Sequence, residues 1–140
     1  MDRAELVAFV RRHARAMVAT KGPAGTAQTA EYRIAITDEA EFIFETSIYS
    51  QKYANIRSFS GVALIVGGDE PVVVQSEGIA DVLADAERDR CLRVYFQQFP
   101  ADRARAKDRD ITYVRIRPQW IRMRDSRPGS VGVQEIPLTP

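Results

Sequence analysis

The chain has 140 residues, a formal net charge of +1 and 45% hydrophobic residues, a composition typical of one soluble globular domain. Its 20 basic residues balance 19 acidic ones, so charge gives no reason to expect a nucleic acid or an anionic membrane as partner. The single cysteine excludes an intramolecular disulfide, and no apolar run approaches the roughly 20 residues of a membrane span, so a cytoplasmic location is expected.

The N-terminal half alternates predicted helices and strands. Residues 2–14 are predicted to be a helix, because Asp2 and Glu5 have the spacing of a capping box and apolar residues recur at helical intervals. A second helix is expected over 50–59, with Ser50 as its N-cap. Strands are expected over 16–20, 28–37 and 41–46, and in the last of these Phe42 and Phe44 alternate with Ile43.

The C-terminal half predicts one more helix and four more strands. Asp85 is expected to cap a helix that runs to about residue 98. Gly78 lies inside a long strand pattern, where it predicts a bulge, and Pro118 predicts a break between the last two strands. These strands are expected over 62–66, 72–83, 111–117 and 120–124, with a loop over 101–109.

Six or seven strands joined mainly by short turns predict a mainly antiparallel β fold with about three short helices. Closing such a sheet into a barrel removes its exposed edges. The domain is expected to occupy residues 1–125. Residues 126–140 are rich in proline, glycine and polar residues and are expected to be a C-terminal tail.

The residue types needed for several common chemistries are scarce. His13 is the only histidine and Cys91 the only cysteine, so a metal cluster or a Ser-His-acid triad is not expected. His13 lies at the end of a predicted surface helix, which also makes it a poor haem ligand. Catalytic and metal-binding residues therefore cannot be assigned from the sequence.

One group of residues has the spacing of a phosphate site. Arg33 lies in a predicted strand, and the segment 46–52 ends another strand and opens a helix with Ser50 as cap and Lys52 in its first turn. The first-turn amides of a helix have no intrahelical partner and favour an anion. The alternative is a capped surface helix with a solvated lysine, and spacing alone leaves both interpretations open.

Beyond these patterns, the chain from residue 17 to residue 99 resembles the flavin-binding half of the pyridoxamine 5'-phosphate oxidase family. The family pattern places an R-x-V strand before a strand that ends F-x-T-x-x-x-S-x-K, followed by an apolar strand and a strand ending in E-G-x-A. The corresponding segments here are Met17–Thr20, Tyr32–Ile34, Ile43–Thr46 with Ser50 and Lys52, Val62–Val66, Glu77–Ala80 and Val94–Pro100.

The resemblance implies an antiparallel split β-barrel that forms a homodimer and holds FMN at the dimer interface. By position, Arg33 and Lys52 would bind the FMN phosphate. The remaining cofactor-binding residues implied are Thr46, Ser47 and Ser50 around the flavin or phosphate, and Gln75 facing the same site.

Several positions depart from the family pattern. Gln51 replaces a frequent second phosphate arginine, and Asp38 lies near the place of a lysine. The arginine-x-histidine that holds the substrate of the true oxidases has no counterpart after Trp120, a residue that would lie in the core, at the dimer interface or against the flavin ring. We therefore expect an FMN-dependent oxidoreductase acting on an unknown small molecule, not a true pyridoxamine phosphate oxidase. The alternatives are an F420-dependent reductase and a non-catalytic flavin-binding or sensor module.

Overall fold

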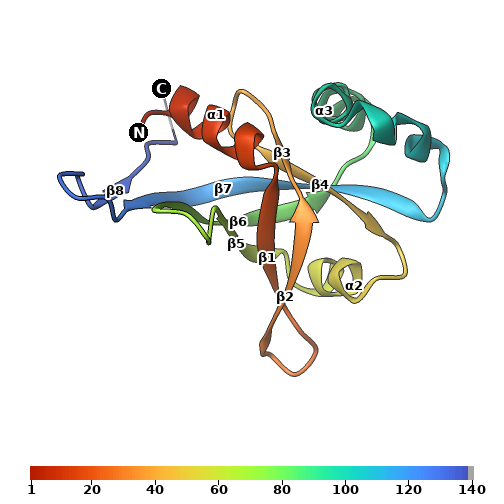
Figure 1. Ribbon diagram of the computed structural model, residues 1–140. Coiled ribbons are helices and arrows are strands. Elements are labelled where there is room, and N and C mark those ends of the chain that lie inside the picture. The colour runs from red at the N-terminus through yellow and green to blue at the C-terminus, as the bar shows by residue number, and fades with distance from the viewer. Residues whose placement is uncertain (139–140) are drawn as a thin grey trace.

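The computed structural model describes residues 1–138, over which the chain forms an eight-stranded antiparallel sheet and four helices (Figure 1). The helices are α1 (Arg3–His13), α2 (Gln51–Ser58), α3 (Asp85–Gln98) and the 3-10 helix η1 (Pro100–Lys107). The strands are β1 (Arg15–Lys21), β2 (Ala27–Arg33), β3 (Ala35–Ile36), β4 (Phe42–Ser47), β5 (Gly61–Val66), β6 (Val72–Val82), β7 (Ile111–Asp125) and β8 (Val133–Glu135). The predicted antiparallel split barrel is confirmed.

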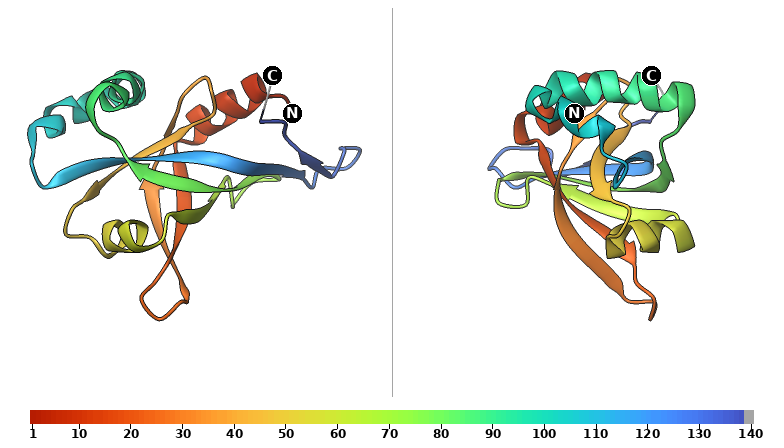
Figure 2. Two further views of the ribbon diagram at one scale, coloured as in Figure 1. Left: turned by 180° about the vertical axis from the view of Figure 1, so that it is seen from behind. Right: turned by 90° about the vertical axis from the view of Figure 1, so that its right-hand side faces the viewer.

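The sheet has the strand order β2-β1-β5-β6-β7-β4-β3, and β8 pairs with β7. It curls until β2 contacts β4, where the ring of Tyr32 packs 4.6 Å from the ring of Phe44. In Figure 2, α1 and α3 lie on one side of the long β6–β7 ribbon and α2 lies on the other. The end of β2 is thereby placed between α2 and α3.

Two hydrophobic cores result, one on each face of β4. Phe42 and Phe44 point into the barrel with α1 and the inward residues of β1, β5, β6 and β7. Ile43 points the other way and packs under α3 against Leu92 and Tyr95. The predicted alternation is therefore confirmed, and both faces are buried. Each such side chain contributes about 1.5–3 kcal/mol through its burial.

The predicted strand over 28–37 is in fact two strands. β2 pairs with β1 and β3 pairs with β4, so the chain crosses between different neighbours at Ile34. The Ile34 amide donates to the carbonyl of Ala14, 2.9 Å away, which extends the β1–β2 register by one residue before the chain turns to β4. A single strand was expected because nothing in the local pattern marks this change of partner.

The predicted break at Pro118 is wrong, because β7 is continuous from Ile111 to Asp125. The bulge predicted at Gly78 is confirmed. The register against β7 shifts between Glu77 and Gly78. Glu77 is opposite Trp120 and Gly78 is opposite Pro118, so Gln119 has no opposite residue on β6. Proline is tolerated in this strand because a bulge needs no ladder donor at that position.

Two smaller expectations also change, and the C-terminal segment adds one short strand. Asp85 is the first residue of α3 and has a left-handed φ of 55°, while Ala84 occupies the cap position without a side-chain bond. The expected loop over 101–109 contains η1. The tail contributes β8, and Ile136 is buried in the barrel core, whereas residues 139–140 lie outside the described part of the chain. None of the helices within residues 1–138 is long and apolar enough to cross a membrane.

Candidate functional site

Three hydroxyl groups meet where β4 leads into α2, and we call Tyr32, Thr46 and Ser50 the hydroxyl cluster. The Thr46 and Ser50 oxygens are 2.9 Å apart, and the Tyr32 hydroxyl is 3.2 Å from that of Thr46. Ser50 is the N-cap of α2, as predicted, and its hydroxyl accepts from the amide of Tyr53 at 3.1 Å. The cluster therefore adjoins the first-turn amides of α2, which favour an anionic group.

Lys52 lies on the inner side of α2 and is almost completely buried, with 6% of its surface exposed. Its ammonium donates to the carbonyls of Val18, 2.7 Å away, and Gln28, 3.1 Å away, and burial lowers its pKa. Asn55, one turn later, donates to Thr20 and to the Gln28 side chain. The interpretation of Lys52 as a solvated surface lysine is wrong. In this conformation its ammonium ties α2 to the β1–β2 hairpin.

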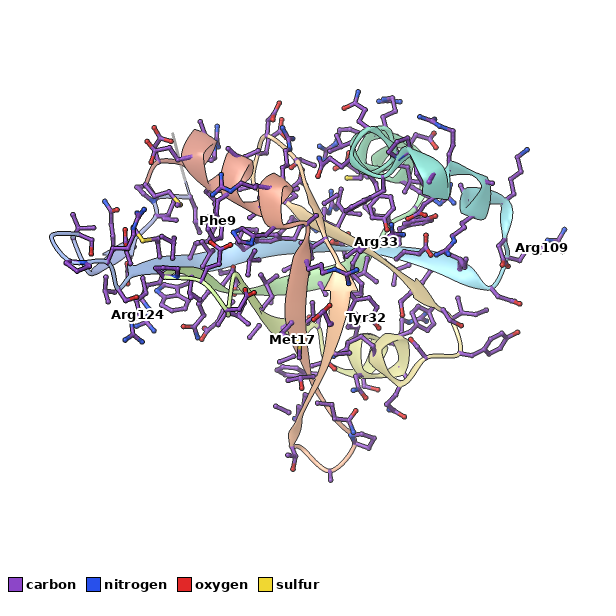
Figure 3. All side chains as sticks on the ribbon, viewed as in Figure 1. Phe9, Met17, Tyr32, Arg33, Arg109 and Arg124 are labelled. Atoms are coloured by element: carbon purple, nitrogen blue, oxygen red, sulfur yellow. The ribbon has the colours of Figure 1, made fainter. Side chains whose placement is uncertain are left out.

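Arg33, the last residue of β2, contacts η1 and Phe99, the residue just before it. Its guanidinium forms an ion pair with the carboxylate of Asp102 and lies 5.0 Å from the centre of the Phe99 ring. Asp102 is buried, and Arg33 is 38% exposed at its side chain. Figure 3 places Arg33 and Tyr32 together at the end of β2, between α3 and α2.

On the α3 side of β4, a second arginine is paired with a carboxylate. Arg105 of η1 donates to the carboxylate of Glu45 at 3.0 Å, and the hydroxyl of Tyr113 donates to the same carboxylate at 3.2 Å. Burial, followed by the charge of Glu45, raises the pKa of both Tyr95 and Tyr113. Arg33 and Arg105 are thus each paired with a carboxylate.

The other predicted site residues are spread apart. Ser47 is exposed and its hydroxyl accepts from the amide of Tyr49. Gln75 lies on the outer face of β6, where its carbonyl oxygen accepts from Arg122 at 3.0 Å. The structure therefore joins Thr46 and Ser50, places Arg33 at the end of the strand that carries Tyr32, and leaves Gln75 on another face of the chain.

Two polar residues of this region were missed by the sequence analysis. Tyr32 precedes Arg33 in the quoted motif, so its place in the hydroxyl cluster could have been noticed. Asp102 lies 69 residues from Arg33 in an unremarkable charged segment, and no local pattern announces their pairing. Gln51 and Asp38 are the two positions near the site that depart from the family pattern. Gln51 donates to Asn55, and the negative charge of Asp38 is paired with Arg11.

The outer face of β1, β5 and β6 is partly apolar. Met17 and Ile65, which face each other across the β1–β5 pair, are 40% and 36% exposed. A shallow groove of about 480 Å³ continues this face between Phe59 and Ile79. Trp120 lies outside the core, half-buried on the neighbouring β7, where its indole donates to Glu135 at 3.1 Å.

Fold and site together define a split β-barrel with a polar cluster at a helix N-terminus. The model of the family described as Pyridoxamine 5'-phosphate oxidase matches residues 3–125, which is most of the chain. The chain therefore belongs to this family. No curated protein matches it.

Solved structures support the fold. The conserved hypothetical protein Rv2991 from Mycobacterium tuberculosis is 25% identical, with a TM-score of 0.74, over 91% of this chain and 86% of its own. A heme binding protein from Mycobacterium smegmatis is 13% identical, with a TM-score of 0.74, over 92% of this chain and 57% of its own. A protein named F420 Reductase is 24% identical, with a TM-score of 0.61, over 81% of this chain and 93% of its own. The chain thus spans little more than half the length of the Mycobacterium smegmatis protein.

Proposed function

We propose that this protein binds FMN as a homodimer and uses it for redox chemistry on a small molecule. The observation that carries the proposal is the hydroxyl cluster at the N-terminus of α2, beside a strand that ends in Arg33, in a chain of the pyridoxamine 5'-phosphate oxidase family. Hydroxyl groups, first-turn amides and a guanidinium are the donor set that a phosphate monoester requires.

The residues fit a phosphate in part. Thr46 and Ser50 would donate to the phosphate, and Arg33 would supply the charge. The ammonium of Lys52 is held by two carbonyls, so in this proposal it orients α2 and contacts FMN only after a rearrangement. Bound FMN supplies the hydride or electron transfer, while the protein binds and orients it.

We expect FMN to bind more tightly than riboflavin, since riboflavin lacks the phosphate. Replacing Arg33 by glutamine should weaken FMN about tenfold, or about 1.4 kcal/mol, and leave riboflavin unchanged. Flavin fluorescence titration of both ligands measures this. Arg109→Gln is the matched control, because Arg109 is exposed and lies in the turn before β7. Equal affinities for FMN and riboflavin would contradict the phosphate site.

The same titration separates the alternatives. Binding of F420 without FMN would favour an F420-dependent reductase. If FMN binds, oxidation of NADH or NADPH by the loaded protein tests the redox part of the proposal. Tight FMN binding without turnover of any donor would instead favour a flavin-binding or sensor module.

The outer face of β1, β5 and β6 is the proposed contact between the two subunits. We expect a dimer of about 31 kDa, twice the chain mass of 15.7 kDa, in sedimentation equilibrium. Ile65→Arg places a charge in this apolar face and should give a monomer. Val131→Arg, at a 72% exposed position in the loop before β8, is the control and should stay dimeric. A monomeric native protein, with or without FMN, would contradict the proposal.

A further inference from the structure

The carboxylate of Asp102 is paired with the guanidinium of Arg33, which the proposed FMN site needs for the phosphate. The ion pair joins the end of β2 to η1, and the Asp102 side chain is only 9% exposed, against 38% for Arg33. The amide of Asp102 donates to the carbonyl of Phe99 at 3.1 Å, which places Asp102 in the first turn of η1. The positive charge of Arg33 is therefore already neutralised by a carboxylate of the same chain.

We propose that Asp102 is an internal counter-ion that lowers the affinity of the site for a phosphate group, an inference that rests on the proposed FMN function. Two negative groups that share one guanidinium repel each other, and the repulsion is stronger where water is partly excluded. A phosphate that reaches Arg33 must displace the Asp102 carboxylate or lie beside it. In either case the negative charge of Asp102 opposes the phosphate.

Asp102 belongs to the 3-10 helix η1. The hydrogen-bond geometry of a 3-10 helix is poorer than that of an α-helix, so such helices are usually short. At eight residues, η1 is long for a 3-10 helix. Two further side-chain bonds hold η1, from Arg88 to the carbonyl of Ala106 at 3.2 Å and from Arg105 to Glu45 at 3.0 Å. Neither bond involves Asp102, so a change of its side chain leaves both partners of each bond in place.

Asp102→Asn tests the inference, because asparagine keeps the shape and an accepting oxygen but removes the charge. We expect it to tighten FMN about tenfold and to leave riboflavin within twofold of the native protein. Asp102→Ser is the second variant, in case the asparagine variant folds poorly. Asp108→Asn, at the exposed end of the same segment, is the matched control for net charge and should change neither ligand.

A second measurement needs no flavin. Inorganic phosphate, compared with chloride at equal ionic strength, should raise the thermal midpoint of Asp102→Asn more than that of the native protein. If native protein prefers FMN over riboflavin but neither Asp102 variant tightens FMN, the counter-ion inference is wrong and the FMN function stands. If no form binds FMN but phosphate stabilises the Asp102 variants selectively, the FMN function is wrong and the counter-ion stands. Failure of both readouts overturns both.

Discussion

Replacing Arg115 by methionine is expected to lower the free energy of unfolding by about 3–5 kcal/mol, the range for breaking a buried ion pair from one side. The Arg115 side chain is only 5% exposed on β7. It makes two bonds to Asp81, of 3.1 and 2.9 Å, and single bonds to Glu41 at 3.1 Å and Glu87 at 2.8 Å. One guanidinium thus joins β6, the start of β4 and α3.

Methionine fills most of the space but leaves these carboxylates without their shared partner. Asp81 is the most affected, because it loses two hydrogen bonds, whereas Glu41 keeps its bonds from Arg90. Hydrogen bonds from Arg90 and then from Arg115 hold the pKa of Glu87 at about 2, so that pKa should rise toward its usual value in the variant. Urea unfolding measures the stability, and NMR titration of the Glu87 carboxylate measures the pKa.

Arg117→Met is the matched control for Arg115→Met. Arg117 lies two residues along the same strand, is 59% exposed and approaches Asp81 only to 3.8 Å. An exposed pair of this kind contributes about 0–1 kcal/mol. Equal losses for the two variants would mean that burial of the Arg115 network does not matter, and a loss below about 1 kcal/mol for Arg115→Met would contradict its structural role.

Gly78→Ala is expected to cost about 3 kcal/mol, at the upper end of the range for overpacking. A Cβ at Gly78 would lie 2.5 Å from the carbonyl oxygen of Arg117 and 3.0 Å from the Cα of Pro118. Both are backbone atoms of the bulged pair, so neither can move aside as a side chain would. The φ angle of Gly78 lies outside the left-handed region, so the cost comes from space and not from backbone strain. Urea unfolding of the variant measures it.

Gly68→Ala separates this steric effect from the general effect of removing a glycine. No heavy atom lies within 4 Å of a Cβ at Gly68, which is in the β5–β6 turn and also lacks a left-handed φ. Its stability should be unchanged or rise by up to about 1 kcal/mol, because alanine restricts the unfolded chain. A Gly78 variant as stable as the Gly68 variant would show that the bulge accommodates a side chain.

The sequence by itself determined the features that depend on neighbouring residues. The capping of α1 by Asp2 and of α2 by Ser50, the alternation around Ile43 and the bulge at Gly78 were all predicted correctly. Each is a local effect, since a cap, a pleat or a missing Cβ acts within a few residues of itself. The order of these motifs along the chain was also enough to indicate the family, which the match over residues 3–125 confirms.

The tertiary structure decided what depends on residues far apart in the chain. The split of the 28–37 strand follows from a change of partner strand at Ile34, and the burial of Lys52 follows from carbonyls 34 and 24 residues away. The pairing of Arg33 with Asp102 spans 69 residues. The sequence does not show whether a charged side chain faces water or a buried partner. Its partner is selected only when the sheet curls and α3 and η1 pack beside β2, because the attraction depends on distance and burial in space.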